Sequence, residues 1–91
     1  FIEIKPEQLS RGGKLQQFES IPGIFDLTHL EIGGIGLLTI DDIENKYPQL
    51  RYLDLYSNKI FSVDAVDELK KLKKLYSVNF AENPIMIHLH L

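Results

Sequence analysis

The chain has 91 residues, which permits one small domain, and its 44% hydrophobic and 25% charged residues are typical of a globular protein. The formal net charge of −3 argues against general nucleic-acid binding, which depends on Lys and Arg contacts to phosphates. The lack of cysteine excludes a disulfide scaffold and thiolate metal sites, and the longest mostly apolar stretch, 32–40, is too short to span a membrane.

Apolar residues recur along the chain in the frame L-x-x-L-x-L-x-x-N-x-L. In chain order the copies contain Ile2, Ile4 and Leu9; Leu27, Leu30, Ile32, Ile35 and Leu37; Leu50, Leu53, Leu55, Asn58 and Ile60; and Leu75, Val78, Phe80, Asn83 and Ile85. The equivalent positions Ile2, Leu30, Leu53 and Val78 are 28, 23 and 25 residues apart. Leucine-rich repeats have periods of about 20–29 residues. We therefore predict a single leucine-rich-repeat domain over residues 1–91, with about four repeats.

Such a repeat is one strand followed by a returning segment, and the repeats stack into a solenoid. The predicted fold class is therefore α/β, with a short parallel sheet on the concave face and helical or 3-10 segments on the convex face. We expect returning segments at 41–46 and 64–71, because each begins with an acid, Asp41 or Asp64, that can cap a helix. Pro48 ends the first of these segments.

The second returning segment ends in a run of lysines, Lys70, Lys71, Lys73 and Lys74. Leu69, Leu72 and Leu75 interrupt this run at three-residue spacing, which indicates a buried side. The lysines therefore favour a solvated convex face over a nuclear-import or nucleic-acid patch.

Alternation along each strand predicts which side chains face outward. If Leu53 and Leu55 point inward, Tyr52, Asp54 and Tyr56 point onto the concave sheet. The same alternation gives Phe1, Glu3 and Lys5; His29, Glu31 and Gly33; and Ser77, Asn79 and Ala81. One column therefore contains Glu3, Glu31, Asp54 and Asn79, an acidic stripe suited to a basic partner. The alternative is a solvated face without a partner.

Asn58 and Asn83 occupy the position where each strand bends into its loop. A buried amide there can satisfy backbone groups that leave the sheet, so we predict a structural asparagine ladder. Ile35 replaces the asparagine in the second repeat, where Gly33, Gly34 and Gly36 are expected to let the backbone close.

The sequence contains no dinucleotide-binding fingerprint, no phosphate loop and no H-E-x-x-H. On an extended strand, His88 and His90 would share a face. Two imidazoles without a carboxylate or thiol ligand nevertheless make a poor metal site. We therefore expect no enzyme, no cofactor, no metal site and no small-molecule substrate.

The segment Tyr47–Ile60, continued by Leu69-Lys-Lys-Leu72 and Leu75 to Ile85, resembles the leucine-rich domain of the acidic leucine-rich nuclear phosphoprotein 32 family. That family has K-C-P-N-L-x-x-L-x-L-S-x-N-K-I here, followed by L-K-K-L. Gly13-Lys14-Leu15 and Ile35-Gly36-Leu37 match its G-K-L and V-G-L segments. SDS22-type phosphatase 1 regulators, the spliceosomal A-prime protein and the outer-arm dynein light chain share much of the pattern.

The resemblance implies a nuclear and cytoplasmic adaptor that binds histones, phosphatase 2A or other proteins, as a histone chaperone or phosphatase inhibitor does. It carries the partner-binding role onto His29, Glu31, Tyr52, Asp54, Tyr56, Ser77 and Asn79. The alternative is a structural section of a longer SDS22-like protein. The family's capping motif is replaced by 86–91, and its acidic tail does not follow. We therefore expect a fragment lacking a C-terminal cap. A third alternative is that the uncapped end, with Val78, Phe80 and Ile85 on its last strand, pairs with a second copy through an unprotected edge.

Overall fold

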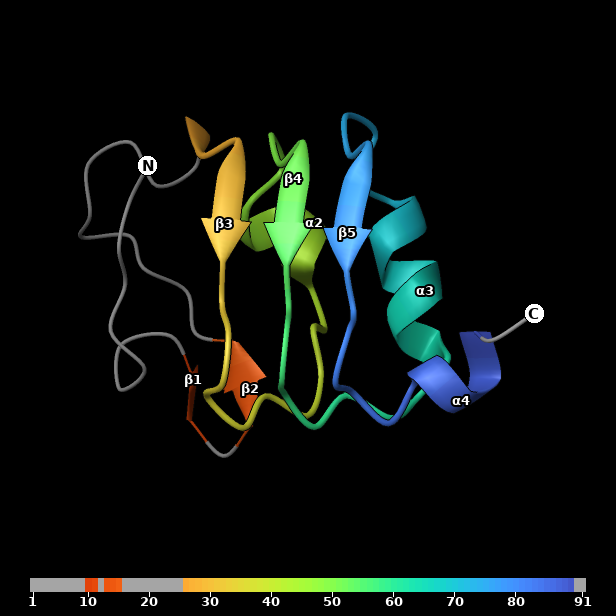
Figure 1. Cartoon of the computed structure of the whole chain (residues 1–91). Coiled ribbons are helices and arrows are strands. Elements are labelled where there is room, and N and C mark those ends of the chain that lie inside the picture. Colours follow the sequence, from red (N-terminus) through yellow and green to blue (C-terminus); the bar gives the residue numbers. More distant parts are fainter. Residues whose placement is uncertain (1–9, 12, 16–25, 90–91) are drawn as a thin grey trace.

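A computed structural model describes residues 10–11, 13–15 and 26–89 of the chain (Figure 1). Among these residues, three parallel strands form one sheet in the order β3 (His29–Glu31), β4 (Tyr52–Asp54) and β5 (Ser77–Asn79). Short helices alternate with them: α2 (Ile43–Lys46) precedes β4, α3 (Asp64–Lys70) precedes β5, and α4 (Met86–Leu89) follows β5. The predicted α/β class is confirmed, as a three-stranded parallel sheet that alternates with short helices.

The strands pair in the register that the repeat frame predicts. Leu30 is the register partner of Leu53, and Leu53 is the partner of Val78. Backbone bonds continue past the strand ends, since Ile32 N donates to Asp54 O and Leu55 N to Asn79 O, both at 2.8 Å. In Figure 1 the three strands lie side by side and α2 lies behind β4.

The core is built from the repeated apolar positions. Leu30 and Leu53 are at most 1% exposed. The other buried apolar residues are Leu27, Ile32, Leu37, Ile40, Ile43, Tyr47, Leu50, Leu55, Ile60, Ala65, Leu69, Leu72, Phe80 and Ile85. Phe80 and Ile85 were expected on the last strand with Val78, but they follow β5 and turn into the core. Only Val78 of these three lies on the edge strand.

The helix starts differ from the predicted caps. α2 begins after Asp42, whose backbone is left-handed at φ 65°, and the Asp41 carbonyl instead accepts a bond from Lys46 Nζ at 3.1 Å. α3 begins after Val63, and its Asp64 N donates to Ser62 Oγ at 3.2 Å. The prediction that Asp41 and Asp64 cap these helices is therefore wrong, because Asp41 precedes the cap position and Asp64 is already helical. Asp64 still lies in the first turn, where its charge favours the helix dipole.

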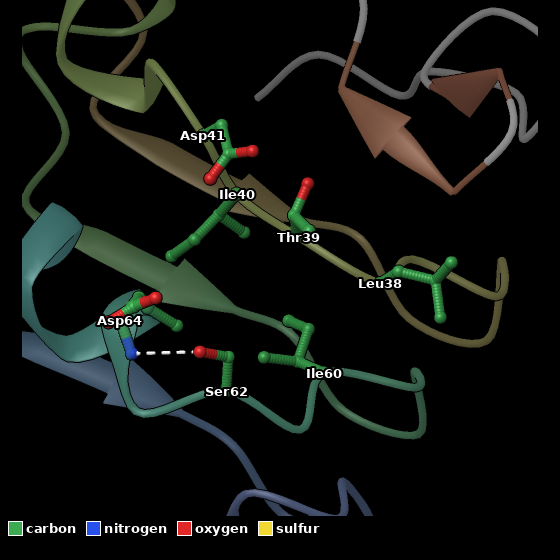
Figure 2. A pocket seen from close by; sticks show the side chains of 8 residues that line it. Leu38, Thr39, Ile40, Asp41, Ile60, Ser62 and Asp64 are labelled. Atoms are coloured by element: carbon green, nitrogen blue, oxygen red, sulfur yellow. Dashed lines mark hydrogen bonds between the residues drawn. The ribbon is translucent and has the colours of Figure 1, made fainter.

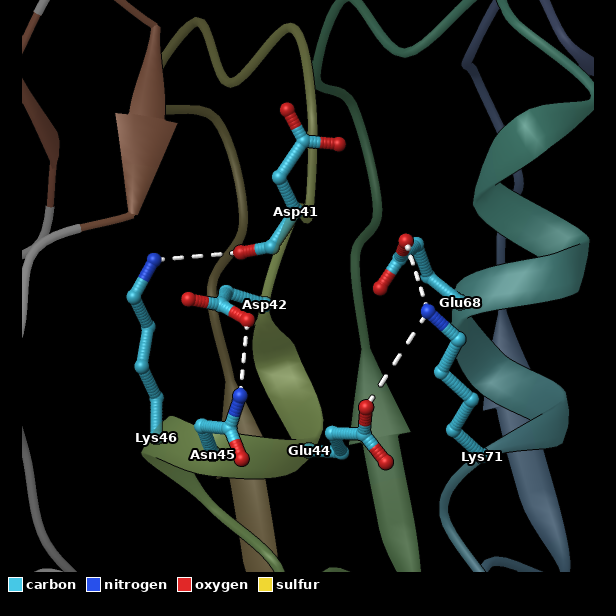
Figure 3. A network of polar contacts seen from close by, with 7 residues as sticks. All are labelled: Asp41, Asp42, Glu44, Asn45, Lys46, Glu68 and Lys71. Atoms are coloured by element: carbon cyan, nitrogen blue, oxygen red, sulfur yellow. Dashed lines mark hydrogen bonds and ion pairs between the residues drawn. The ribbon is translucent and has the colours of Figure 1, made fainter.

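Polar contacts join α2 to α3 (Figure 3). Lys71 Nζ lies 3.3 Å from Glu68 Oε1 in one direction and 4.0 Å from Glu44 Oε1 on α2 in the other. The hydrogen bond that Lys71 donates to Glu68, followed by the negative charge of Glu68, raises the pKa of Lys71. Because these groups are exposed or half-exposed, the contacts orient the two helices more than they stabilise the fold.

A small hairpin precedes the sheet. β1 (Ser10–Arg11) and β2 (Lys14–Leu15) pair antiparallel, a feature that the repeat frame did not predict. Gly13 has φ 77°, its carbonyl accepts a bond from Leu38 N at 2.8 Å, and a Cβ here would lie 2.7 Å from the Leu38 side chain. Glycine is therefore required where the hairpin meets residue 38. The predicted outward residues of the first repeat, Phe1, Glu3 and Lys5, lie outside the described residues.

Candidate protein-interaction surface

The outward side chains of the three strands form rows across the sheet. The register places His29 beside Tyr52 and Ser77, and Glu31 beside Asp54 and Asn79. Tyr56 extends the pattern one step, since Gly34 N donates to its carbonyl at 3.0 Å. We call these seven residues the sheet face: His29, Glu31, Tyr52, Asp54, Tyr56, Ser77 and Asn79. His29, Glu31 and Tyr56 are exposed and the other four are half-buried.

The aromatic side chains of the sheet face differ in how firmly they are held. The rings of His29 and Tyr52 stack with centroids 5.6 Å apart and planes 22° apart. Thr28 Oγ1 lies 3.1 Å from His29 Nδ1, which fixes the imidazole further. Tyr56 is 48% exposed. The face therefore presents an ordered aromatic pair and one more exposed ring, and such rings are favoured anchors in protein interfaces.

The acidic residues of the face are Glu31 and Asp54, which are register partners on neighbouring strands. Strands in a sheet lie about 4.8 Å apart, so the two carboxylates stand on adjacent backbones. Asp54 also has a local role, since its Oδ1 accepts a bond from Tyr56 N at 2.9 Å. Asn79 Oδ1 accepts from Ala81 N in the same way, also at 2.9 Å.

The sequence analysis did not predict that Asp54 and Asn79 form turns. The sequence does indicate it, because Asp54 and Asn79 occupy the same position of the L-x-x-L-x-L-x-x-N-x-L frame. Both residue types commonly accept a hydrogen bond from the backbone N–H two positions ahead. Ser57 and Glu82, three residues after Asp54 and Asn79, have φ of 59° and 60°. The two repeats therefore share one turn, and an oxygen at Asp54 is needed to form it.

Asn58 and Asn83 are buried and hold the loops together. Asn58 Oδ1 accepts bonds from Ile35 N and Leu37 N, each at 3.1 Å, and its Nδ2 donates to Leu55 O at 3.0 Å. Asn83 Oδ1 accepts from Ile60 N at 3.1 Å, and its Nδ2 donates to Leu55 O at 2.7 Å. Each amide thus serves the preceding repeat, and Asn58 bonds the loop in which Ile35 occupies the asparagine position.

Two exposed aromatic residues were not predicted. Tyr76, directly before β5, is 71% exposed, and Phe61, between β4 and α3, is also exposed. Tyr76 N donates to Arg51 O at 2.9 Å, which places Tyr76 beside an exposed arginine. Strand alternation could not find Tyr76 because it lies just before the strand, where the alternation of faces does not yet apply.

A separate pocket of about 180 Å³ lies between the segment after β3 and the start of α3 (Figure 2). Its lining includes Thr39, Asp41, Ser62 and Asp64. Across the described residues, no three His, Cys, Asp or Glu side chains lie close enough together to hold a metal ion. Asp41 and Asp64 therefore do not form a metal centre with a third ligand of these types from the described part of the chain.

Within the described ranges, no helix has the length and apolar character that a membrane crossing requires. Comparisons of the chain with known protein families, curated proteins and solved structures find no match.

Proposed function

We propose that the chain is a short leucine-rich-repeat solenoid that binds a basic segment of a protein partner through the sheet face. The observation that supports this proposal best is the register, which sets Glu31 beside Asp54 and His29 beside Tyr52 on adjacent parallel strands. Acidic groups steer basic partners, and the aromatic rings supply contact area in the same patch.

The repeated geometry supports the solenoid part of the proposal. Asn58 and Asn83, 25 residues apart, make equivalent bonds, and the turns before them at Ser57 and Glu82 share a left-handed backbone.

The resemblance to the acidic leucine-rich nuclear phosphoprotein 32 family supplies the class of partner, with histones or a protein phosphatase as candidates in the nucleus and cytoplasm. The alternative is a structural section of a longer SDS22-like protein, which the half-exposed Val78 at the sheet edge favours.

The test is capture of core histones or lysine-rich peptides at low and high salt. The variant combines Glu31→Gln with Asp54→Asn, which removes both charges while the asparagine amide keeps the turn bond that Asn79 makes at the same register. We expect binding to weaken roughly tenfold at low salt, and the difference from the native chain to shrink at high salt because salt screens exposed charges.

The matched control combines Asp41→Asn with Glu82→Gln, which makes the same change in net charge at exposed positions that are not part of the sheet face. This control should keep most of the affinity. If both double variants bind as the native chain does, or if both lose affinity equally, the sheet face is not the binding surface.

A further inference from the structure

The outer edge of β5 carries a groove of apolar side chains. The groove has a volume of about 330 Å³. We call its lining the edge surface: Val66, Leu69 and Lys70 of α3, and Leu75, Val78 and Phe80 in or beside β5. Val78 is 38% exposed, whereas its register equivalents Leu30 and Leu53 are at most 1% exposed. Among the described strands, none pairs with β5 on its outer side.

We infer that the edge surface is a self-association interface, in which two copies of the chain pair their β5 and α3 edges across a two-fold axis. Within the fold, the edge of β4 is covered by a parallel strand and its helix, β5 and α3, whereas the two-fold axis brings the same two elements in antiparallel. A second copy presents such a strand and helix. A two-fold axis makes the two β5 strands antiparallel, and unpaired edge strands readily pair with another chain.

The charges of α3 fit this symmetry. β4 and β5 are parallel, so α3 runs back between them, and the two-fold axis sets the two α3 helices antiparallel. Asp64 and Asp67 lie in the first turn of α3, and Lys70 lies in its last turn. The acidic start of each helix therefore faces the basic end of the other, so the two helices are complementary in charge.

The charges of Asp67 and Lys70 pair with each other within one copy and are exposed enough for a second chain to reach them. Within one copy Lys70 Nζ lies 3.7 Å from Asp67 Oδ1, and the two side chains are 73% and 72% exposed. In the dimer, each Asp67 lies on the side of α3 that approaches Lys70 of the other copy. α4, which carries the exposed Met86 and Ile87, lies at the same end of the molecule as α3 (Figure 1).

The first test measures the molar mass of the full chain by light scattering over a concentration series. The native chain should form a dimer, and Val78→Lys should shift it to monomer at the same concentrations. The control is Tyr56→Lys, which adds the same charge at an exposed residue of the sheet face. It should leave the dimer unchanged, and circular dichroism should show that both variants are folded.

The second test exchanges the charges of α3. Asp67→Lys alone and Lys70→Asp alone should each weaken the dimer, because each sets like charges opposite one another. The double variant, Asp67→Lys with Lys70→Asp, should restore it. A native chain that stays monomeric at every concentration, equal losses in Val78→Lys and Tyr56→Lys, or failure of the double variant to restore the dimer would each overturn the inference.

Discussion

The side-chain amide of Asn58 forms several hydrogen bonds to backbone groups. It accepts from two backbone N–H groups and donates to Ile32 O and Leu55 O, all in or near the core. We expect Asn58→Ala to lower the free energy of unfolding by roughly 3 kcal/mol or more, because each buried group left unpaired costs about 1–3 kcal/mol. Urea unfolding measures this loss. Asn45→Ala, which removes one exposed bond to Asp42, is the control and should cost less than about 1 kcal/mol.

Tyr47 should make the free energy of unfolding depend on pH. Burial raises the pKa of Tyr47 to about 12 from 10.0. The unfolded chain releases this proton first, so the free energy of unfolding is unaffected by Tyr47 ionisation below pH 10 and falls as the pH rises toward 12. At 1.36 kcal/mol per pKa unit, the native chain should lose roughly 2–3 kcal/mol over this interval from Tyr47.

The variant Tyr47→Phe removes the ionisable hydroxyl and with it this loss of stability at high pH. Among the described residues, the Tyr47 hydroxyl has no hydrogen-bond partner, so its loss below pH 10 should be neutral or slightly stabilising. Between pH 10 and 12 the variant should lose less stability than the native chain, as measured by urea unfolding at several pH values. The control Tyr56→Phe should keep the native slope, and identical slopes in all three chains would contradict the assignment.

At the scale of elements, the start of α3 depends on Ser62. Its hydroxyl accepts the bond from Asp64 N and is the side-chain oxygen that holds the first turn. We expect Ser62→Ala to lower the free energy of unfolding by about 1 kcal/mol, the usual loss when a capping oxygen is removed. Ser62→Asp, which keeps an oxygen near the same N–H, should retain most of it. Equal unfolding midpoints for Ser62→Ala and the native chain would show that this contact does not hold the helix.

The elements also show what the sequence could and could not predict. Leu53 and Leu55 located β4 and its faces, because alternating burial fixes both the strand and the direction of each side chain. The helix starts were not predictable in this way, since α2 begins after the left-handed backbone of Asp42 and the first turn of α3 is bonded to the Ser62 hydroxyl. The β1–β2 hairpin was missed because strands of two residues are too short to show alternation. The rows of the sheet face were predictable, but the use of Asp54 in a turn depends on local geometry that a repeat frame does not reveal.

At the scale of the whole molecule, stability should fall from the centre of the described sheet to its edge. β4 is paired on both sides, whereas β5 is paired on one, and Val78 is exposed where Leu53 is buried. Leu53→Ala should therefore lower the free energy of unfolding by about 3–5 kcal/mol, since it leaves a cavity that the neighbouring strands cannot close. Val78→Ala should lower it by about 1 kcal/mol, because much of the side chain already contacts water.

Urea unfolding of both variants at low protein concentration compares the two positions without a contribution from self-association. Phe61→Ala, at an exposed aromatic residue outside the strands, controls for loss of apolar surface alone and should change the midpoint little. β4 pairs with a strand on each side, so the difference between Leu53→Ala and Val78→Ala measures how strongly β4 depends on contacts from both sides. Equal losses at the two positions would mean that β5 is covered in solution even in the monomer, and that the edge surface is not open.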